Sequence, residues 1–253
     1  MLIVANWKAY VETRTKAKSL FAAAKRLSAR PPLRFSVTRQ IVLAPPAPYL
    51  GLLATKNTSK VRFAAQDISD TTGGARTGEI TAALLKDLGV GYVILGHSER
   101  RAAGETDSVV ASKVAHALAH DLIPILCVGE SERDADAHYL HAVRAQIATV
   151  FEPLSTQERI KVIIAYEPIW AIGKSAAEAI LPQDLTEMIL YLRKVLSEYL
   201  PDGQGMTAKI LYGGSVEPTN ARALAAGSGI DGFLVGHASI DTQAFTALVK
   251  AVS

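Results

Sequence analysis

A glutamate at the end of an apolar run is the most chemically informative feature of this sequence. Residues Val162 to Ala165 form an apolar β run, Glu167 follows, and Pro168 ends the predicted strand because it cannot donate to a strand ladder. A carboxylate at the end of a buried strand costs free energy unless chemistry requires it. The next residues, Ile169 to Gly173, are bulky and apolar with a terminal glycine, as expected for a lid that excludes water. The pattern indicates a general base beneath a lid.

Other polar groups follow other apolar runs in the same way. In a parallel barrel the carboxyl ends of the strands meet at one rim, where catalytic groups gather. Read in chain order, these ends carry Asn6 and Lys8, Gln66, His97-Ser98-Glu99, Cys127 to Glu130, Glu167, Tyr212 to Ser215, and Gly236-His237. The opposite ends carry little that is comparable. This asymmetry favours an enzyme over a passive scaffold.

The architecture follows from the alternation of apolar runs and amphipathic segments. The runs are nearly continuous in apolar character, which is typical of parallel strands covered on both faces. We predict strands at Leu2–Ala5, Gln40–Ala44, Val61–Ala65, Gly91–Leu95, Ile123–Val128, Val162–Tyr166, Lys209–Tyr212 and Gly232–Val235, with helices including Thr15–Leu27, Thr81–Leu88, Asp107–Ala119, Leu185–Leu200 and Pro218–Ala226. We therefore predict an α/β fold, a single (β/α)8 barrel domain over residues 1–253. A doubly wound open sheet remains the alternative, although it would more often show an early dinucleotide glycine loop.

Composition narrows the class of protein. The 253 residues are 49% hydrophobic, enough for a large core, and 27 basic against 24 acidic residues give a formal charge of +3. That balance does not suggest nucleic-acid binding, although a pocket for a small anion remains possible. The single cysteine, Cys127, excludes an internal disulfide, and Leu2–Ala5 is too short for a signal-peptide core. We expect a soluble cytoplasmic protein that associates with neither a membrane nor a nucleic acid.

Several segments resemble the signature segments of the triosephosphate isomerase family. Four of them, in the expected order, each fall at a predicted strand end, and the likeness extends along the whole chain. The segments are Asn6-Trp7-Lys8, Gly96 to Arg101, Ala165 to Gly173 and Tyr212 to Val216, together with Thr77 to Ile80 and Asp231 to Gly236. The resemblance implies an isomerase of glycolysis and gluconeogenesis that interconverts dihydroxyacetone phosphate and D-glyceraldehyde 3-phosphate through an enediol(ate).

The resemblance also implies a role for each catalytic group. Glu167 would move a proton between adjacent carbons, and neutral His97 would polarise the carbonyl and shuttle a proton between the oxygens. The positive end of a short helix opening at Ser98 would disfavour the imidazolium. Lys8 would supply fixed positive charge, Asn6 a hydrogen bond to the oxyanion region, and Glu99 part of the charged network. No cofactor is implied, because side chains supply every function.

The resemblance also implies a phosphate-binding site and a lid. Backbone amides of Gly173, Ser215, Gly236 and His237 would cradle the phosphate. Trp170 with Glu130 would hold one state of the lid, and Tyr212 with Ser215 would hold it closed on ligand. The lid would consist of Pro168, Ile169, Trp170, Ala171, Ile172, Gly173, Lys174, Ser175 and Ala176.

The chain departs from the family pattern at three places. After Gly173 the family usually continues Thr-Gly-Lys-Thr, whereas this chain has Lys174-Ser175-Ala176, so the tip is either shortened or rewritten with a longer lid. His237 replaces a glycine; we expect a backbone role with the ring turned away, the alternative being that the ring tunes phosphate affinity or pH response. Arg76 lies in the loop through which the family forms homodimers. We still expect a homodimer through the loop around Thr77, weaker or differently packed.

Other functions were weighed against this one. An isomerase of a related ketose phosphate, such as a tetrulose phosphate, would share Glu167, His97 and Lys8, and the altered lid leaves it open. A catalytically dead barrel that binds a sugar phosphate or a protein is disfavoured by the complete catalytic set. A metal-dependent aldolase would need clustered ligands, and His97, His237 and Glu167 lack a convincing spacing for a metal site.

Overall fold

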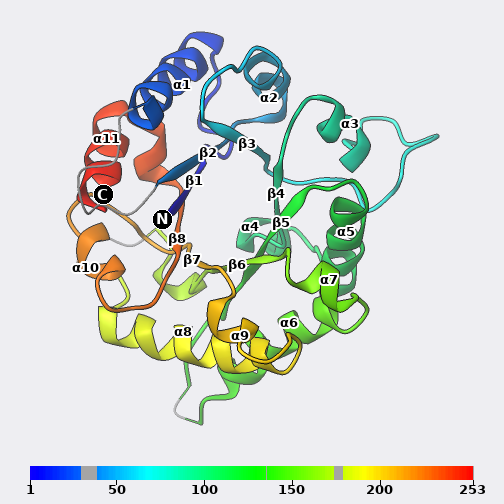
Figure 1. The fold of residues 1–253 in the computed structure, drawn as a ribbon, viewed down its shortest axis with the longest axis vertical. Coiled ribbons are helices and arrows are strands. Elements are labelled where there is room, and N and C mark those ends of the chain that lie inside the picture. The colour runs from blue at the N-terminus through cyan, green and yellow to red at the C-terminus, as the bar shows by residue number, and fades with distance from the viewer. Residues whose placement is uncertain (30–38, 135, 174–178, 253) are drawn as a thin grey trace.

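Eight parallel strands form a closed barrel at the centre of the protein (Figure 1). The structure is a computed structural model that describes residues 1–29, 39–134, 136–173 and 179–252. Each strand pairs with the next along the chain, and the last pairs with the first. The strands are β1 (Leu2–Asn6), β2 (Gln40–Ala44), β3 (Arg62–Ala65), β4 (Tyr92–Leu95), β5 (Ile123–Val128), β6 (Ile163–Tyr166), β7 (Ile210–Tyr212) and β8 (Gly232–Val235). The predicted (β/α)8 barrel is confirmed.

Helices surround the barrel and connect successive strands, as Figure 1 shows. They are α1 (Arg14–Ala29), α2 (Ala47–Ala54), α3 (Ala82–Asp87), α4 (Ser98–Ala102), α5 (Asp107–Ala119), α6 (His138–Phe151), α7 (Thr156–Arg159), α8 (Pro182–Ser197), α9 (Gln204–Thr207), α10 (Ala221–Ala225) and α11 (Thr242–Ala251), with 3-10 turns η1 (Ile169–Ala171) and η2 (His237–Ile240). Among the described residues, none of these helices is both long and apolar enough to cross a bilayer.

Local chemistry sets where the helices begin and explains two predicted bounds that were wrong. The predicted segment Leu185–Leu200 is displaced because α8 begins at Pro182, whose ring suits the first helical turn. The predicted segment Pro218–Ala226 is shortened because the Asn220 side chain accepts from the Glu217 amide and donates to the Ser215 carbonyl. Those bonds hold the chain before α10 as a loop, close to the barrel mouth.

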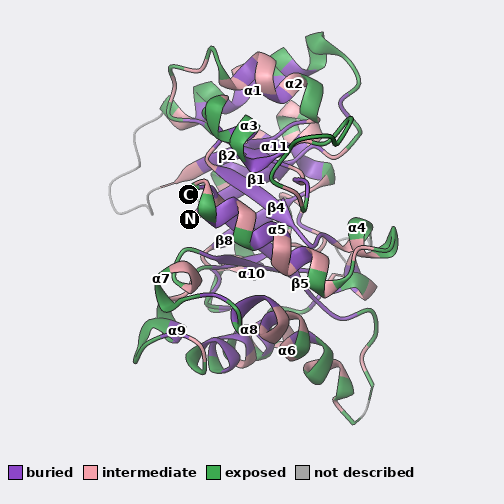
Figure 2. Cartoon of the chain, turned by 90° about the vertical axis from the view of Figure 1, so that its right-hand side faces the viewer, coloured by how far each residue is buried: buried purple, intermediate pink, exposed green. Residues whose placement is uncertain are grey.

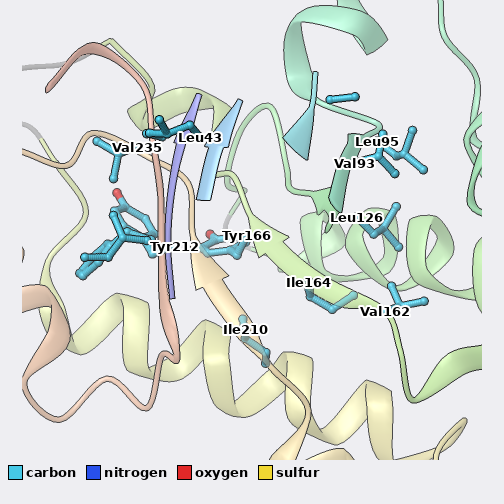
Figure 3. Packing of buried hydrophobic residues seen from close by; sticks show 14 of the residues in the cluster. Leu43, Val93, Leu95, Leu126, Val162, Ile164, Tyr166, Ile210, Tyr212 and Val235 are labelled. Atoms are coloured by element: carbon cyan, nitrogen blue, oxygen red, sulfur yellow. The ribbon is translucent and has the colours of Figure 1, made fainter. Parts of the chain in front are cut away.

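The core has two layers, one on each face of the strands (Figures 2 and 3). Alternate strand residues point outward against the helices, and Figure 3 shows Val93, Leu126 and Ile164 in that layer. The intervening residues fill the barrel: Leu2, Val4, Val42, Ala44, Ala64, Tyr92, Ile94, Ile125, Cys127, Ile163, Ala165, Leu211 and Leu234. In Figure 2 the strands are mostly buried, with Arg62 at the start of β3 exposed, while the other exposed residues lie on the outer helix faces and in loops. Side chains therefore cover both faces of the barrel sheet, as is typical of parallel strands.

The alternation also decides which side chains reach the barrel mouth. Successive side chains of a strand point to opposite faces, so residues two apart share a face. Leu2 and Val4 point inward on β1, and Asn6 continues that row. Ile163 and Ala165 point inward on β6, and Glu167 continues theirs. On β1 and β6 the inward row therefore ends in a polar side chain at the carboxyl end of the barrel.

Candidate active site

A cavity of about 530 Å³ opens at the carboxyl ends of the strands. It gathers most of the polar residues that the sequence predicted to meet there. The lining includes Asn6, Lys8, His97, Glu99, Glu167, Ile172, Gly173, Gly213, Gly214, Ser215, Glu217, Gly236 and His237. The predicted residues Glu130 and Tyr212 lie outside this lining, and Lys174, Ser175 and Ala176 lie outside the described residues.

Glu167 is a buried carboxylate with a defined orientation. Its residue is only 2% exposed. The Ser98 amide donates to Oε2 at 3.0 Å, and Oε1 lies 3.1 Å from His97 Nε2. Burial raises the pKa of the Glu167 carboxyl, while His97, the Ser98 amide and Lys8 oppose that rise. A carboxylate whose proton affinity is raised towards the working pH is suited to accept and return a proton.

His97 is held in one tautomer by the helix that it caps. Its Nδ1 accepts a hydrogen bond from the Glu99 amide at 3.2 Å, at the first turn of α4. A nitrogen that accepts from a backbone amide carries no proton, so the ring proton is on Nε2, which faces Glu167. This arrangement is compatible with the neutral ring expected from a helix that begins at Ser98, and that role stays a prediction. The ring presents an N–H donor to the cavity.

Lys8 is fixed by both its backbone and its side chain. Its φ of 46° lies in the left-handed region, which is rare for a residue with a Cβ. The Lys8 amide donates to Asn6 Oδ1 at 3.1 Å, and Gln66 Nε2 donates to the Lys8 carbonyl at 3.0 Å. The Lys8 ammonium pairs with Glu99 Oε1 at 2.6 Å. These contacts keep a cation at the cavity wall in a conformation that the isolated chain would rarely adopt.

The other end of the cavity is lined by loops after β6, β7 and β8. Gly173 has a φ of 72°, and the Ser215 hydroxyl donates to the Ala171 carbonyl at 3.0 Å. Gly236 and His237 follow β8, where the chain enters η2. His237 does not adopt a positive φ, so a side chain at this position carries no left-handed backbone strain. Its side chain is 83% exposed and points toward Glu217, with Nδ1 3.9 Å from Oε1.

The segment after Glu167 is anchored to the loop after β5. Trp170 Nε1 donates to Glu130 Oε1 at 2.9 Å, and the Tyr166 hydroxyl donates to the same oxygen at 2.8 Å. Glu130 is 2% exposed, so this carboxylate is a buried acceptor shared by a strand residue and a lid residue. The predicted Trp170–Glu130 contact is therefore present, at the same time as the Ser215–Ala171 contact.

Comparison with known proteins gives the family. A family model described as "Triosephosphate isomerase" matches residues 1–252. The chain belongs to the triosephosphate isomerase family. Proteins named triosephosphate isomerase are 40% identical over 255 residues in Symbiobacterium thermophilum (100% of this chain, 96% of the relative) and 38% identical over 256 residues in Moorella thermoacetica (98% and 97%). One from Alcanivorax borkumensis is 41% identical over 214 residues, covering 84% of this chain and 85% of its own.

Arg133 contacts the lid tryptophan and Glu130, a role that the sequence alone did not suggest. Its guanidinium lies over the rings of Tyr139 and Trp170, 5.2 Å and 5.0 Å from their centroids. It also donates to Glu130 Oε1 at 3.1 Å and to the Tyr166 hydroxyl at 3.1 Å. Arg133 therefore connects the loop after β5 to the lid tryptophan. The sequence feature that could have revealed it is the spacing of three residues between Glu130, the predicted partner of Trp170, and Arg133.

Two glycines make room for the catalytic and lid side chains. A Cβ at Gly213 would lie 2.9 Å from Glu167 Cγ, and a Cβ at Gly214 would lie 2.2 Å from the Tyr212 hydroxyl oxygen. Neither position has positive φ, so space and not backbone conformation requires glycine. The packing of Gly213 against Glu167 becomes visible only when β6 and β7 are placed side by side.

Burial raises the pKa values of two groups near the site, the Cys127 thiol and the Tyr212 hydroxyl. Burial raises the pKa of the Cys127 thiol well above its usual range, and the neighbouring Glu167 charge adds to the rise. Cys127 therefore packs as a neutral group inside the barrel. Burial also raises the pKa of Tyr212, although the nearby Ile180 backbone opposes this. The Tyr212 hydroxyl has no hydrogen-bond partner of acceptable geometry within the described ranges.

Proposed function

We propose that this protein is a triosephosphate isomerase that interconverts dihydroxyacetone phosphate and D-glyceraldehyde 3-phosphate. The observation that carries the proposal is the pairing of the buried Glu167 carboxylate with the Nε2–H side of His97, 3.1 Å apart, inside the barrel-mouth cavity. Such a pair offers a base for a carbon-bound proton beside a donor for a carbonyl oxygen. The family match and the full-length relatives named triosephosphate isomerase support the same assignment.

In the proposed reaction, one proton moves between adjacent carbons and one between their oxygens, and no electrons enter or leave. Glu167 takes the proton from the carbon next to the carbonyl, and the C–H electrons form the enediolate double bond. His97 donates its Nε2 proton to the developing oxyanion and recovers a proton from the neighbouring hydroxyl, while Lys8 and Asn6 stabilise negative charge. Glu167 then returns the proton to the adjacent carbon. Glu99 positions Lys8 through their 2.6 Å ion pair.

The phosphate of the substrate would occupy the opposite end of the cavity. Amides of Gly173, Ser215, Gly236 and His237 are the proposed donors, because backbone N–H groups in loops and turns bind phosphate without a charged side chain. The lid proposed from the sequence, from Pro168 to Ala176, would close over the bound substrate and exclude water from the enediolate. Its support is the anchoring of Trp170 to Glu130.

The decisive experiment is isomerisation of D-glyceraldehyde 3-phosphate coupled to NADH consumption, comparing wild type with Glu167→Gln. The substitution keeps the size of the side chain and removes the base, so turnover should fall about 100-fold to 10,000-fold. The matched control is Glu132→Gln, an exposed position outside the cavity, which should leave turnover unchanged. A folded but inactive wild type would refute the proposal, and tetrulose phosphates would then be tested.

We propose further that residues 1–253 act as one cytoplasmic barrel domain that forms homodimers. The support for a dimer is the loop between β3 and α3, which projects from the barrel in Figure 1 and is exposed from residue 72 through residue 79. Below it, a mostly apolar cavity of about 400 Å³ includes Leu84, a leucine that is 55% exposed. A loop this long and exposed is better explained by docking on a second copy than by free solvation. Sedimentation that finds an active monomer at assay concentration would contradict it.

A further inference from the structure

The proposed phosphate end of the cavity contains a carboxylate, Glu217, whose negative charge would repel a bound phosphate. Glu217 follows Ser215 by two residues and lines the same cavity as Gly236 and Lys8. Its backbone is fixed, because its amide donates to Asn220 Oδ1 at 2.9 Å and its carbonyl accepts from the Ala221 amide at 3.0 Å. A negative side chain held beside a dianion weakens binding unless a positive charge offsets it.

His237 is the group placed to offset that charge. Within the described ranges, its ring is the only basic side chain within 4.0 Å of the Glu217 carboxylate, with Nδ1 3.9 Å from Oε1. The other charged and titratable groups that line this cavity are Lys8 and Tyr10 after β1, His97 and Glu99 after β4, and Glu167 after β6. Lys8 is already paired with Glu99, so it does not neutralise Glu217.

We propose that His237 and Glu217 form a proton-controlled determinant of phosphate affinity in this enzyme. When the ring is protonated, it cancels the Glu217 charge beside the phosphate site. When the ring loses its proton, that charge is uncovered and phosphate binding weakens. Histidine is the side-chain type whose charge changes most readily near physiological pH, so phosphate affinity falls as pH rises. The inference rests on the proposed function for its substrate but concerns side chains that the isomerisation itself does not use.

The test uses inorganic sulfate, which keeps the same charge across the pH range of the experiment and so isolates the titration of the protein. Binding is followed through the backbone amide NMR signals of Ser215 and Gly236, at constant ionic strength, from about pH 5.5 to about pH 8.5. Two variants are compared with wild type: His237→Asn and Glu217→Gln. Asparagine keeps the backbone amide that the proposed phosphate site uses and removes only the titrating ring.

The expected results separate the pair from every other titrating group. At the acidic end, His237→Asn binds sulfate about threefold to tenfold more weakly than wild type, because Glu217 is no longer neutralised. At the alkaline end the two proteins converge. Glu217→Gln binds sulfate more tightly than wild type, above all at the alkaline end, because the repelling charge is gone. Titration of Glu167 or His97 is common to all three proteins and cancels in these differences.

Two results would overturn the inference. Equal affinities of wild type and His237→Asn at every pH would mean that the ring has no role, in agreement with a backbone role alone. A Glu217→Gln protein that binds sulfate no more tightly than wild type at the alkaline end would mean that the Glu217 charge does not oppose the anion. Isomerase assays on the same preparations keep the two proposals apart: an inactive wild type with the predicted sulfate profile refutes the proposed reaction and leaves the pair intact.

Discussion

The two ends of the barrel-mouth cavity are built differently. At the proton-transfer end, His97 and Glu167 are 6% and 2% exposed, and each is oriented by a backbone amide of the segment that opens α4. At the phosphate end, Gly173 and His237 are exposed and come from loops after β6 and β8. The proposed reacting groups are thus preorganised by the barrel, whereas the proposed phosphate donors lie on exposed loops, where closure of the proposed lid would act. Changes at the first end should act on the chemical step, and changes at the second on capture and retention of the substrate.

The largest expected effect comes from crowding the proton-transfer end. In Gly213→Ala, the added Cβ would lie 2.9 Å from Glu167 Cγ and displace the base. A misplacement of this kind costs about 100-fold in kcat, with KM changed less. Gly91→Ala is the matched control, because a Cβ there meets nothing within 4 Å. Steady-state kinetics of both variants decide the matter, and near-normal kcat in Gly213→Ala would show that Glu167 tolerates displacement.

A smaller effect is expected where the lid is anchored. Arg133→Met keeps an apolar side chain against Trp170 but removes the cation and its hydrogen bonds to Glu130 and Tyr166. The loss should lower kcat/KM about tenfold through a less well anchored lid, with changed tryptophan emission on ligand binding. Arg144→Met serves as control, since Arg144 pairs with Glu198 on the surface, away from the cavity. Equal losses in both variants would point to general destabilisation.

Retention of the intermediate should depend on Tyr212. Its hydroxyl is buried without a hydrogen-bond partner in the described part of the chain, so Tyr212→Phe should not destabilise the ligand-free protein. If this hydroxyl holds the lid closed, its loss should raise elimination of phosphate from the enediolate about fivefold relative to isomerisation. Methylglyoxal formation per turnover measures this ratio. An unchanged ratio would assign closure to Ser215 and Trp170 alone.

The same contrast explains which features could be predicted from the sequence. Strand bounds follow from nearly continuous apolar runs, and the placement of Asn6 and Glu167 follows from their position at the ends of two such runs, which is a local property. The Gly213 clearance around Glu167 and the Arg133 stack on Trp170 depend on which strands and loops become neighbours, so local patterns did not reveal them. The left-handed backbone of Lys8 was missed for a related reason. It is imposed by distant Gln66 and near Asn6, against the preference of lysine itself.

The smallest effect concerns stability and tests the burial of Glu167 directly. Its folded-state pKa is raised above the ordinary value of 4.5, so the native state holds this proton more tightly than the unfolded state. The resulting stabilisation is present below pH 4.5 and is lost as pH rises through the folded-state pKa. Replacing the Glu167 carboxyl with a neutral amide removes this loss of stability at higher pH.

Glu167→Gln should therefore unfold at the same temperature as wild type in acid and at a higher temperature near neutral pH. The gain should be on the order of 1 kcal/mol, as at other sites where function maintains an unfavourable group. Exposed Glu132→Gln should show no pH-dependent difference. Thermal unfolding of the three proteins across this range is the measurement. A Glu167→Gln protein that is no more stable near neutral pH would mean that the Ser98 amide, His97 and Lys8 fully compensate burial, and that the base is not held at a cost to folding.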